Sequence, residues 1–327
     1  MNTTAITEVL GFAREPGWLP WAVQYFFLIG ISTMAFFLSL PGLLWQRAGW
    51  QDLARHALLA ALVCGLAAPV ALLADLHQPG RFLNFYLHTN FGSWMGWGAY
   101  FIPLYVVGLL AYTWSVLRAN RAGLVFAALV AGVGAVLVLV YTGMETMIVA
   151  ARPLWHSFLI PVFFAATALA GAFGMTAMFE ALAGRREAKV LNGGLHFSQW
   201  AVLLVIAAWL VMALGGAAPY REALATIHGG WVAAWIWFIV SVAVTLWLAR
   251  GASLLIPALF ALHGAWLARW LVFMGGQSVP KLGSTHTAQT LSLTPDSLLG
   301  IIGTAGLCLF IYIVLTSLVR WDDSAHA

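Results

Sequence analysis

The sequence predicts an all-α integral membrane protein with about nine transmembrane helices. Of its 327 residues, 62% are hydrophobic and only 8% are Asp, Glu, Lys or Arg, whereas a soluble domain usually carries about 25% charged residues. The mean hydropathy of +0.91 indicates the same class. So few charges cannot cover a globule of this size, and a soluble fold is therefore excluded. At roughly 20 residues per crossing, the length allows about nine or ten crossings and leaves no room for a separate soluble catalytic domain.

Nine apolar runs are each long enough to cross a bilayer as a helix, which takes roughly 20 residues. A helix is expected because a segment alone in lipid must satisfy its own backbone hydrogen bonds. Barrel strands are excluded because they alternate in polarity over about ten residues. We therefore expect a single polytopic membrane domain over residues 1–327, with helices near residues 21–45, 56–75, 93–116, 122–143, 157–183, 197–217, 229–249, 252–274 and 298–319.

Basic residues and Pro/Gly turns separate these helices in chain order, and the basic residues divide unevenly between the two sides. One side receives nine of the fifteen, which are Arg47, Arg55, Arg118, Arg121, Arg185, Arg186, Lys189, Arg250 and Arg320. The other side receives five, which are Arg14, Arg81, Arg152, Arg221 and Lys281, while Arg269 lies within the eighth helix. Because cytoplasmic loops are enriched in Lys and Arg, the first side is expected to be cytoplasmic, with the N-terminus outside and the C-terminus inside.

Ionisable residues gather where the second helix ends, near the outer boundary of the membrane. Asp75, His77 and Arg81 lie within one short stretch there. Ionisable groups at membrane depth are costly and usually functional, so these residues are expected to handle protons. Alternatively, Pro79 and Gly80 simply stop the helix and Arg81 reaches toward the lipid headgroups.

The end of the fourth helix carries a second set of polar residues at the same side. Tyr141 and Glu145 are four positions apart and share a face if the helix continues that far. A phenol and a carboxylate on one face can hydrogen-bond a quinone oxygen and transfer its proton. Tyr141 could instead belong to an aromatic belt, and Glu145 could form a structural ion pair with Arg152. In the first helix, Gln24 and Tyr25 reach a similar depth.

Two kinds of redox cofactor are not expected in this chain. An iron–sulfur cluster needs about four thiolates, and the chain has only Cys64 and Cys308, both within apolar runs. A haem held by two imidazoles needs two His at matching depth on facing helices. Of the nine His, only His263 lies well inside a helix, and it is expected to be a hydrogen-bonded packing residue.

Three further polar residues in the helices have open roles. Arg269, near the outer end of the eighth helix, is expected either to serve a quinol site or a partner, or to reach the headgroups. Glu180 and Gln199 lie near the cytoplasmic ends of the fifth and sixth helices and could begin a proton path. A solvated helix end is the favoured interpretation of Glu180, and proton translocation stays undecided.

Five stretches of the sequence resemble the NrfD/polysulfide reductase family of membrane subunits. They are residues 18–27, 74–78, 93–99, 152–155 and 279–281. The resemblance implies a fold that includes a pair of four-helix bundles, placed in the inner membrane of a bacterium. The outer side predicted from the basic residues, which carries the N-terminus, is then the periplasm. It also implies a subunit without haem.

The resemblance implies a substrate and partners as well. Such subunits anchor a periplasmic complex and exchange electrons between the quinone pool, here menaquinol or ubiquinol, and an iron–sulfur subunit. That subunit connects to a molybdopterin catalytic subunit. Within the family the chain is most similar to the branch that serves tetrathionate reductases, so tetrathionate is the expected acceptor.

Some residues of the family's quinone site have matches here. In the polysulfide reductase branch, a Tyr in a Tyr-x-Gly stretch after the fourth helix contacts the quinone, and Tyr141 matches it. An acid near the end of the second helix takes part in proton transfer, and Asp75 is the nearest match. The first helix departs from the pattern, because the branch's Asn and His fall at Ala22 and Tyr25, so the role passes to Gln24 or Tyr25.

We therefore expect a quinol head group between the first, second and fourth helices, near the outer face. The expected quinol-binding residues are Gln24, Tyr25 and Tyr141. The expected proton acceptors are Asp75, His77 and Glu145, and Arg81 and Arg152 are expected to orient these carboxylates and keep them ionised.

Alternatives to this function stay open. The same type of subunit could serve a complex that acts on another sulfur, arsenic or selenium compound, with quinone reduced instead of quinol oxidised. A passive membrane anchor would have the same topology. A secondary transporter would place its ionisable residues near the bilayer midplane, whereas here they lie near one surface.

Overall fold

The computed structural model describes residues 17–76, 78–184, 189–279 and 291–319. Within these ranges the secondary structure is helical, without strands, and nine helical spans are long and apolar enough to cross a membrane. The nine-helix prediction is therefore confirmed for this part of the chain. The spans are α1 (Pro20–Leu43), α2 (Gln51–Asp75), α4 (Trp94–Leu117), α5 (Arg121–Met147), α6 (Leu159–Leu182), α7 (Lys189–Leu214), α9 (Gly230–Leu248), a composite Leu255–Ser278, and α12 (Leu298–Leu318).

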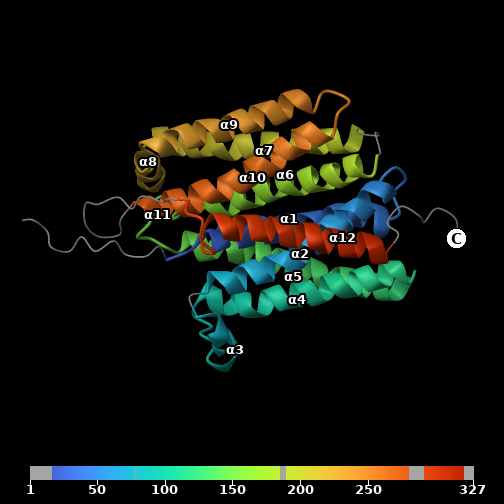
Figure 1. The fold of residues 1–327 in the computed structure, drawn as a ribbon. Coiled ribbons are helices and arrows are strands. Elements are labelled where there is room, and N and C mark those ends of the chain that lie inside the picture. Colours follow the sequence, from blue (N-terminus) through green and yellow to red (C-terminus); the bar gives the residue numbers. More distant parts are fainter. Residues whose placement is uncertain (1–16, 77, 185–188, 280–290, 320–327) are drawn as a thin grey trace, which may run out of the picture.

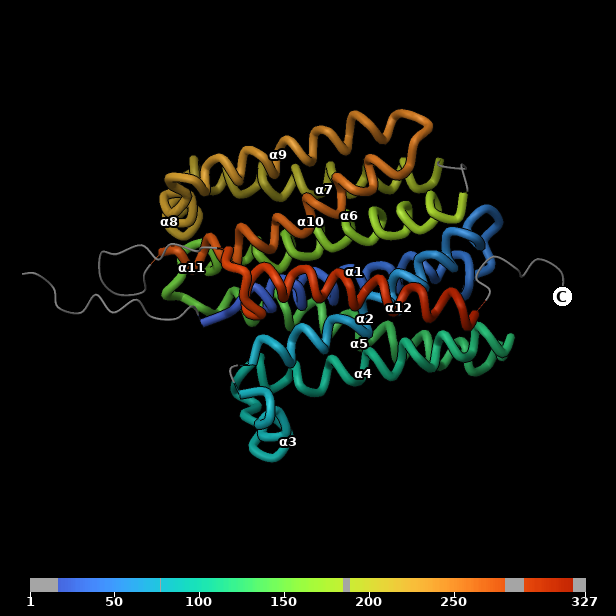
Figure 2. Tube along the Cα trace, in the orientation of Figure 1, coloured from blue at the N-terminus to red at the C-terminus, as the bar shows by residue number. Residues whose placement is uncertain are grey.

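The long helices lie side by side along one common direction, as Figures 1 and 2 show. One group consists of α1, α2, α4 and α5, and a second consists of α6, α7, α9 and α10 (Leu255–Trp270). The two groups meet where α1 and α2 pack against α6 and where α1 packs against α10. The last helix, α12, lies against α1 and α2.

Short helical segments gather at the end of the molecule where α1 begins (Figure 1). They are α3 (Asn84–Leu87), α8 (Ala218–Ala225) and α11 (Gly276–Ser278). We call this the outer end, after the predicted orientation. The composite span reaches it through a π-helical turn, Leu271–Gly275, between α10 and α11.

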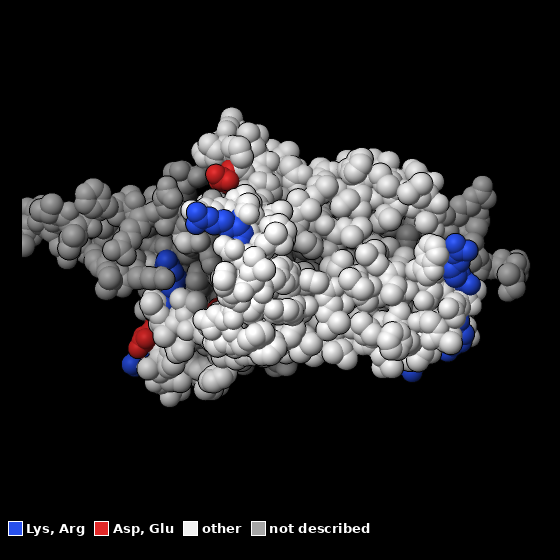
Figure 3. Space-filling view, turned by 90° about the horizontal axis from the view of Figure 1, so that it is seen from below, with Lys and Arg blue, Asp and Glu red and all other residues white. Residues whose placement is uncertain are grey.

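Charged residues lie at the two ends of the face shown in Figure 3, with an uncharged belt between them. On this face the outer end carries both signs of charge, whereas the opposite end shows basic residues alone. The belt is what a membrane-spanning body requires, because a charge in the hydrocarbon region is costly. The orientation of the chain stays a prediction.

Small residues let α4 and α5 pack closely. A Cβ on Gly108 would lie 2.7 Å from the backbone nitrogen of Ala131, and one on Gly134 would lie 2.7 Å from the Cα of Tyr105. Close backbone approach of this kind is a main source of helix association in lipid. Asn120 fixes the start of α5, because its side chain accepts a hydrogen bond from the Gly123 N–H over 3.1 Å.

The structure differs from the expected elements at several ends. Helices α2 and α7 begin at Gln51 and Lys189, before the expected residues 56 and 197. The fourth spanning helix, α5, continues past the expected end at residue 143 to Met147, which places Tyr141 and Glu145 on one continuous helix. Two outer segments expected to be loops contain helices, α8 and α3, the latter after a 3-10 turn at Pro79–Arg81. Such short helices lack a long apolar run, so the hydropathy pattern does not reveal them.

Candidate functional site

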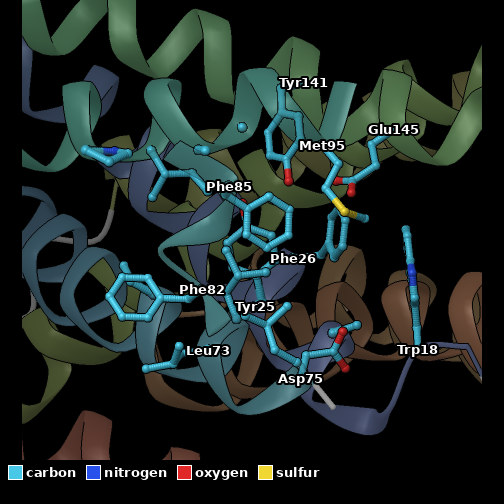
Figure 4. A pocket seen from close by; sticks show the side chains of 18 of the residues that line it. Trp18, Tyr25, Phe26, Leu73, Asp75, Phe82, Phe85, Met95, Tyr141 and Glu145 are labelled. Carbon is cyan, nitrogen blue, oxygen red and sulfur yellow. The ribbon is translucent and has the colours of Figure 1, made fainter. Parts of the chain in front are cut away.

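A cavity of about 320 Å³ lies at the outer end of the first helix group, between α1, α2, α4 and α5. Its walls are mainly apolar and aromatic, and the polar side chains that the helices α1, α2 and α5 contribute to it are Tyr25, Asp75, Tyr141 and Glu145. Figure 4 shows Tyr141 and Glu145 on one wall and Asp75 on the opposite wall. An apolar pocket with a few converging polar groups is the usual form of a small-molecule site.

The helix extension brings the Tyr141 and Glu145 side chains into the same part of the cavity. Tyr25 is 0% exposed, Tyr141 2% and Glu145 7%, and Tyr141 lies close enough to interact with both of the others. In the described part of the chain, the Tyr25 hydroxyl and the Oε2 atom of Glu145 have no hydrogen-bond partner. Buried polar atoms without a partner are unfavourable, so a ligand with polar hydrogens would be stabilised here.

Asp75 links the cavity to the start of α1. Its Oδ1 atom accepts a hydrogen bond from the backbone N–H of Leu19 over 2.9 Å, directly before α1 begins. A carboxylate at a helix N-terminus is favoured by the helix dipole. Asp75 and Glu145 also lie close enough for their charges to repel each other. The cavity therefore holds two acidic side chains in different surroundings, one buried and one at the outer boundary.

Two of the residues expected at the site, Gln24 and Arg81, lie elsewhere. Gln24 is buried but does not line the cavity, and its Oε1 accepts a hydrogen bond from Trp266 of α10 over 3.3 Å. Arg81 is exposed and does not line the cavity. His77 lies outside the described residues.

Arg152 is also not placed as expected, beside the carboxylates of the cavity. It donates hydrogen bonds to the carbonyl oxygens of Gly276 at 2.9 Å and Val279 at 2.7 Å, and its guanidinium lies over the Trp155 ring. Among the described residues, no ion pair joins it to Glu145. Partial burial lowers the pKa of Arg152 from its ordinary value. Its contacts hold the two ends of α11, at Gly276 and Val279, rather than a carboxylate of the cavity.

Several cavity residues are not indicated by the sequence. Trp18 lines the cavity and stacks on Phe26 with ring centroids 5.4 Å apart. Phe82, Phe85 and Tyr86 reach it from the segment that contains α3. Three of the stretches that carry the family resemblance, 18–27, 74–78 and 93–99, contain residues that line this cavity.

The buried polar residues far from the cavity correct two further expectations. Glu180 is not a solvated helix end, because it is 6% exposed and its Oε1 lies 2.9 Å from Nδ1 of His56. Arg269 does not reach the headgroups, because it is 2% exposed and donates to the Phe164 carbonyl at 2.8 Å and to the Thr167 hydroxyl. His263 accepts a hydrogen bond from Trp237 over 2.8 Å, as expected of a packing residue.

Comparisons with known proteins identify the family. Residues 11–281 match the family described as polysulphide reductase, NrfD. Over 215 residues the chain is 37% identical to the C subunit of tetrathionate reductase from Salmonella typhimurium, an alignment that covers 64% of this chain and 62% of that protein. Over 101 residues it is 27% identical to the C subunit of selenate reductase from Mesobacillus selenatarsenatis, covering 31% of this chain and 24% of that protein.

The chain thus spans less than two thirds of the length of either relative. The family match is broader, since it extends from before α1 to beyond α11 and includes every helix that lines the cavity. The multi-pass helical body agrees with a membrane subunit of this kind. On this basis, the protein is a member of the NrfD family of membrane proteins.

Proposed function

We propose that the chain is the haem-free membrane subunit that oxidises quinol for a periplasm-facing molybdopterin oxidoreductase complex in the bacterial inner membrane. Family membership supports a role in such a complex. The two relatives are the C subunits of a tetrathionate reductase and a selenate reductase. Tetrathionate is the proposed acceptor because the first of these relatives is the more similar, at 37% identity over 215 residues. Electrons leave through an iron–sulfur subunit docked at the outer end.

The cavity between α1, α2, α4 and α5 is the observation that carries this proposal. A quinol has an apolar ring with a hydroxyl group at each end, and the cavity offers apolar walls with buried acceptor oxygens between them. The partnerless oxygens of Tyr25 and Glu145 are suited to accept hydrogen bonds from a quinol hydroxyl. Menaquinol or ubiquinol is therefore the proposed substrate.

The residues of the cavity have complementary roles in this reaction. Oxidation of a quinol to a quinone releases both hydroxyl protons together with both electrons. Tyr25 and Tyr141 hold the oxygens of the ring, and Glu145 is the buried base that accepts a proton beside Tyr141. Asp75, at the outer boundary, accepts a proton and releases it to the periplasmic side. The electrons pass outward to the partner subunit.

The test uses the complex purified with its partner subunits. We expect Tyr141→Phe to lower kcat/KM for quinol-dependent tetrathionate reduction roughly 10- to 100-fold, the worth of a lost hydrogen bond to the reacting group. Tyr112→Phe is the matched control, because Tyr112 is equally buried in the same helix group but bonds Ser39, away from the cavity. Wild-type kinetics in assembled Tyr141→Phe and Asp75→Asn complexes would contradict the proposed site.

Binding of a quinol analogue separates this function from a passive anchor. A hydroxyquinoline N-oxide should bind the wild-type complex and should bind the Tyr141→Phe complex more weakly. A passive anchor would bind it equally in both or not at all.

A further inference from the structure

At two levels of the contact between α4 and α5, a tyrosine of one helix lies against a glycine of the other. At the outer level, Tyr141 of α5 lies against Gly98 of α4, and at the next level Tyr105 of α4 lies against Gly134 of α5. In both helices the two levels are separated by seven residues. At each level the glycine leaves the space that the aromatic residue of the opposite helix occupies.

The two glycines constrain different parts of their partners. A Cβ on Gly134 would meet the backbone of Tyr105, with its Cα at 2.7 Å and its nitrogen at 2.8 Å, so Gly134 sets the spacing of the helices. A Cβ on Gly98 would instead meet the tip of the Tyr141 side chain. It would overlap Cζ and lie 2.6 Å from Cε2 and 2.7 Å from the hydroxyl oxygen. Gly98 therefore sets the place of the phenol.

The Tyr141 ring has little freedom to avoid such a contact. The residue is 2% exposed and lies next to Tyr25 and Glu145, and protein interiors are packed too densely to absorb an extra methyl group without movement. A side chain at position 98 would therefore move the phenol relative to both neighbours. Gly98 lies in a helix, where glycine is intrinsically unfavourable, and the space left for Tyr141 accounts for its presence.

We propose that Gly98 is a positioning residue of the quinol site: because it has no side chain, it leaves the space that holds the Tyr141 hydroxyl beside Tyr25 and Glu145. This inference rests on the proposed function, because it assigns the geometry of the same site. It adds a positioning contact on α4, a helix for which the sequence predicts no site residue.

The test is a double-mutant cycle between Gly98→Ala and Tyr141→Leu in the purified complex. Leucine lacks the ring atoms that the new methyl group would meet. We expect Gly98→Ala alone to weaken binding of a hydroxyquinoline N-oxide and to lower kcat/KM for quinol roughly 10- to 100-fold, as small misplacements of a site do. In the Tyr141→Leu background, the same substitution should cause no further loss.

Two control glycines separate positioning from general packing. Gly132→Ala, whose nearest contact is Phe36 at 3.9 Å, should behave as wild type in both assays. Gly134→Ala should lower the melting temperature of the complex, while the assembled fraction keeps the wild-type KM for quinol. A merely structural role of Gly98 would give the pattern of Gly134→Ala, with a lower melting temperature and an unchanged KM.

Several outcomes would overturn the proposal. One is an assembled Gly98→Ala complex with wild-type quinol kinetics and analogue affinity. Another is a loss of equal size in the Tyr141→Leu background, which would mean that the methyl group obstructs the cavity directly. If Gly98→Ala alone fails to assemble, the double variant should recover assembly, and failure to recover it contradicts the contact.

The same cycle distinguishes failure of this inference from failure of the proposed function. If quinol is not bound at this cavity, Tyr141→Leu keeps wild-type quinol kinetics. The melting temperatures would still show that Gly98→Ala is costly only when Tyr141 is present. If the effects of Gly98→Ala and Tyr141→Leu on the melting temperature are coupled but Tyr141→Leu does not change quinol kinetics, the quinol site is refuted. The contact between Gly98 and Tyr141 then still holds.

Discussion

The Asp75 carboxylate accepts a hydrogen bond from the backbone N–H of Leu19 over 2.9 Å, and so joins the end of α2 to the start of α1. The residue that the sequence suggests for proton transfer therefore also has a structural contact. Because a carboxylate and an amide oxygen both accept such a bond, the two roles can be separated by the choice of substitution.

Asp75→Asn should keep the link to Leu19 but remove the proton acceptor. We expect the complex to assemble with a melting temperature close to wild type, while kcat for quinol oxidation falls at least roughly tenfold, as for loss of a proton-transfer group. Asp75→Ala should lose both functions, with a cost of about 1 kcal/mol in stability, the usual value for a lost N-terminal cap. Equal stability of the two variants would show that the Leu19 contact contributes nothing.

Arg152 is expected to act on the outer end of the composite span rather than on quinol chemistry. It donates to the carbonyls of Gly276 and Val279, and hydrogen bonds from charged donors are worth about 1.5 to 3 kcal/mol. Arg152→Met should therefore increase hydrogen exchange over residues 276–279, while quinol KM stays within about twofold of wild type. A large rise in KM with unchanged exchange would restore the role in carboxylate orientation.

The buried pair of His56 and Glu180 should stabilise the contact between α2 and α6. The two side chains are 5% and 8% exposed, and removing one partner of a buried pair typically costs roughly 3 kcal/mol. Glu180→Ala should lower the melting temperature clearly, whereas Glu180→Gln keeps a hydrogen-bonding side chain and should lose less. Thermal unfolding of both variants is the measurement, and an unchanged melting temperature in Glu180→Ala would refute the stabilising role.

The helices are predictable because a membrane-spanning segment must be both apolar and about 20 residues long, and these two requirements leave a strong signal. The depth of Asp75, Tyr141 and Glu145 is predictable for the same reason, since each lies near the end of a span. The rotation of a helix about its axis is not predictable from the hydropathy pattern. Gln24 and Tyr25 are adjacent in α1, so their side chains point about 100° apart, and only Tyr25 lines the cavity.

Two further features depend on contacts between distant segments. The partners of Arg152 lie more than one hundred residues away at Gly276 and Val279, and no local pattern indicates them. Gly98 gives no signal either, because a glycine in an apolar run resembles many others until the neighbouring helix is placed. Only its resemblance to a family distinguishes the stretch 93–99.

Tyr25→Phe should stabilise the quinol-free complex and weaken its function. The hydroxyl of Tyr25 is fully buried, and its oxygen has no hydrogen-bond partner among the described residues, so removing it relieves an unsatisfied group and should raise stability by up to about 1 kcal/mol. Tyr105→Phe is the control, because the Tyr105 hydroxyl bonds Ser32 over 2.7 Å and its removal should lower stability by a similar amount. The effects on quinol kinetics should be the opposite of those on stability. The KM for quinol should rise in Tyr25→Phe and stay at the wild-type value in Tyr105→Phe. The melting temperatures of the quinol-free complexes test the predicted stabilities. Quinol kinetics, measured on the same preparations, test the predicted changes in KM. If the Tyr25→Phe complex is less stable than wild type, the Tyr25 hydroxyl has a hydrogen-bond partner within the wild-type protein. No ligand is then required to satisfy that hydroxyl.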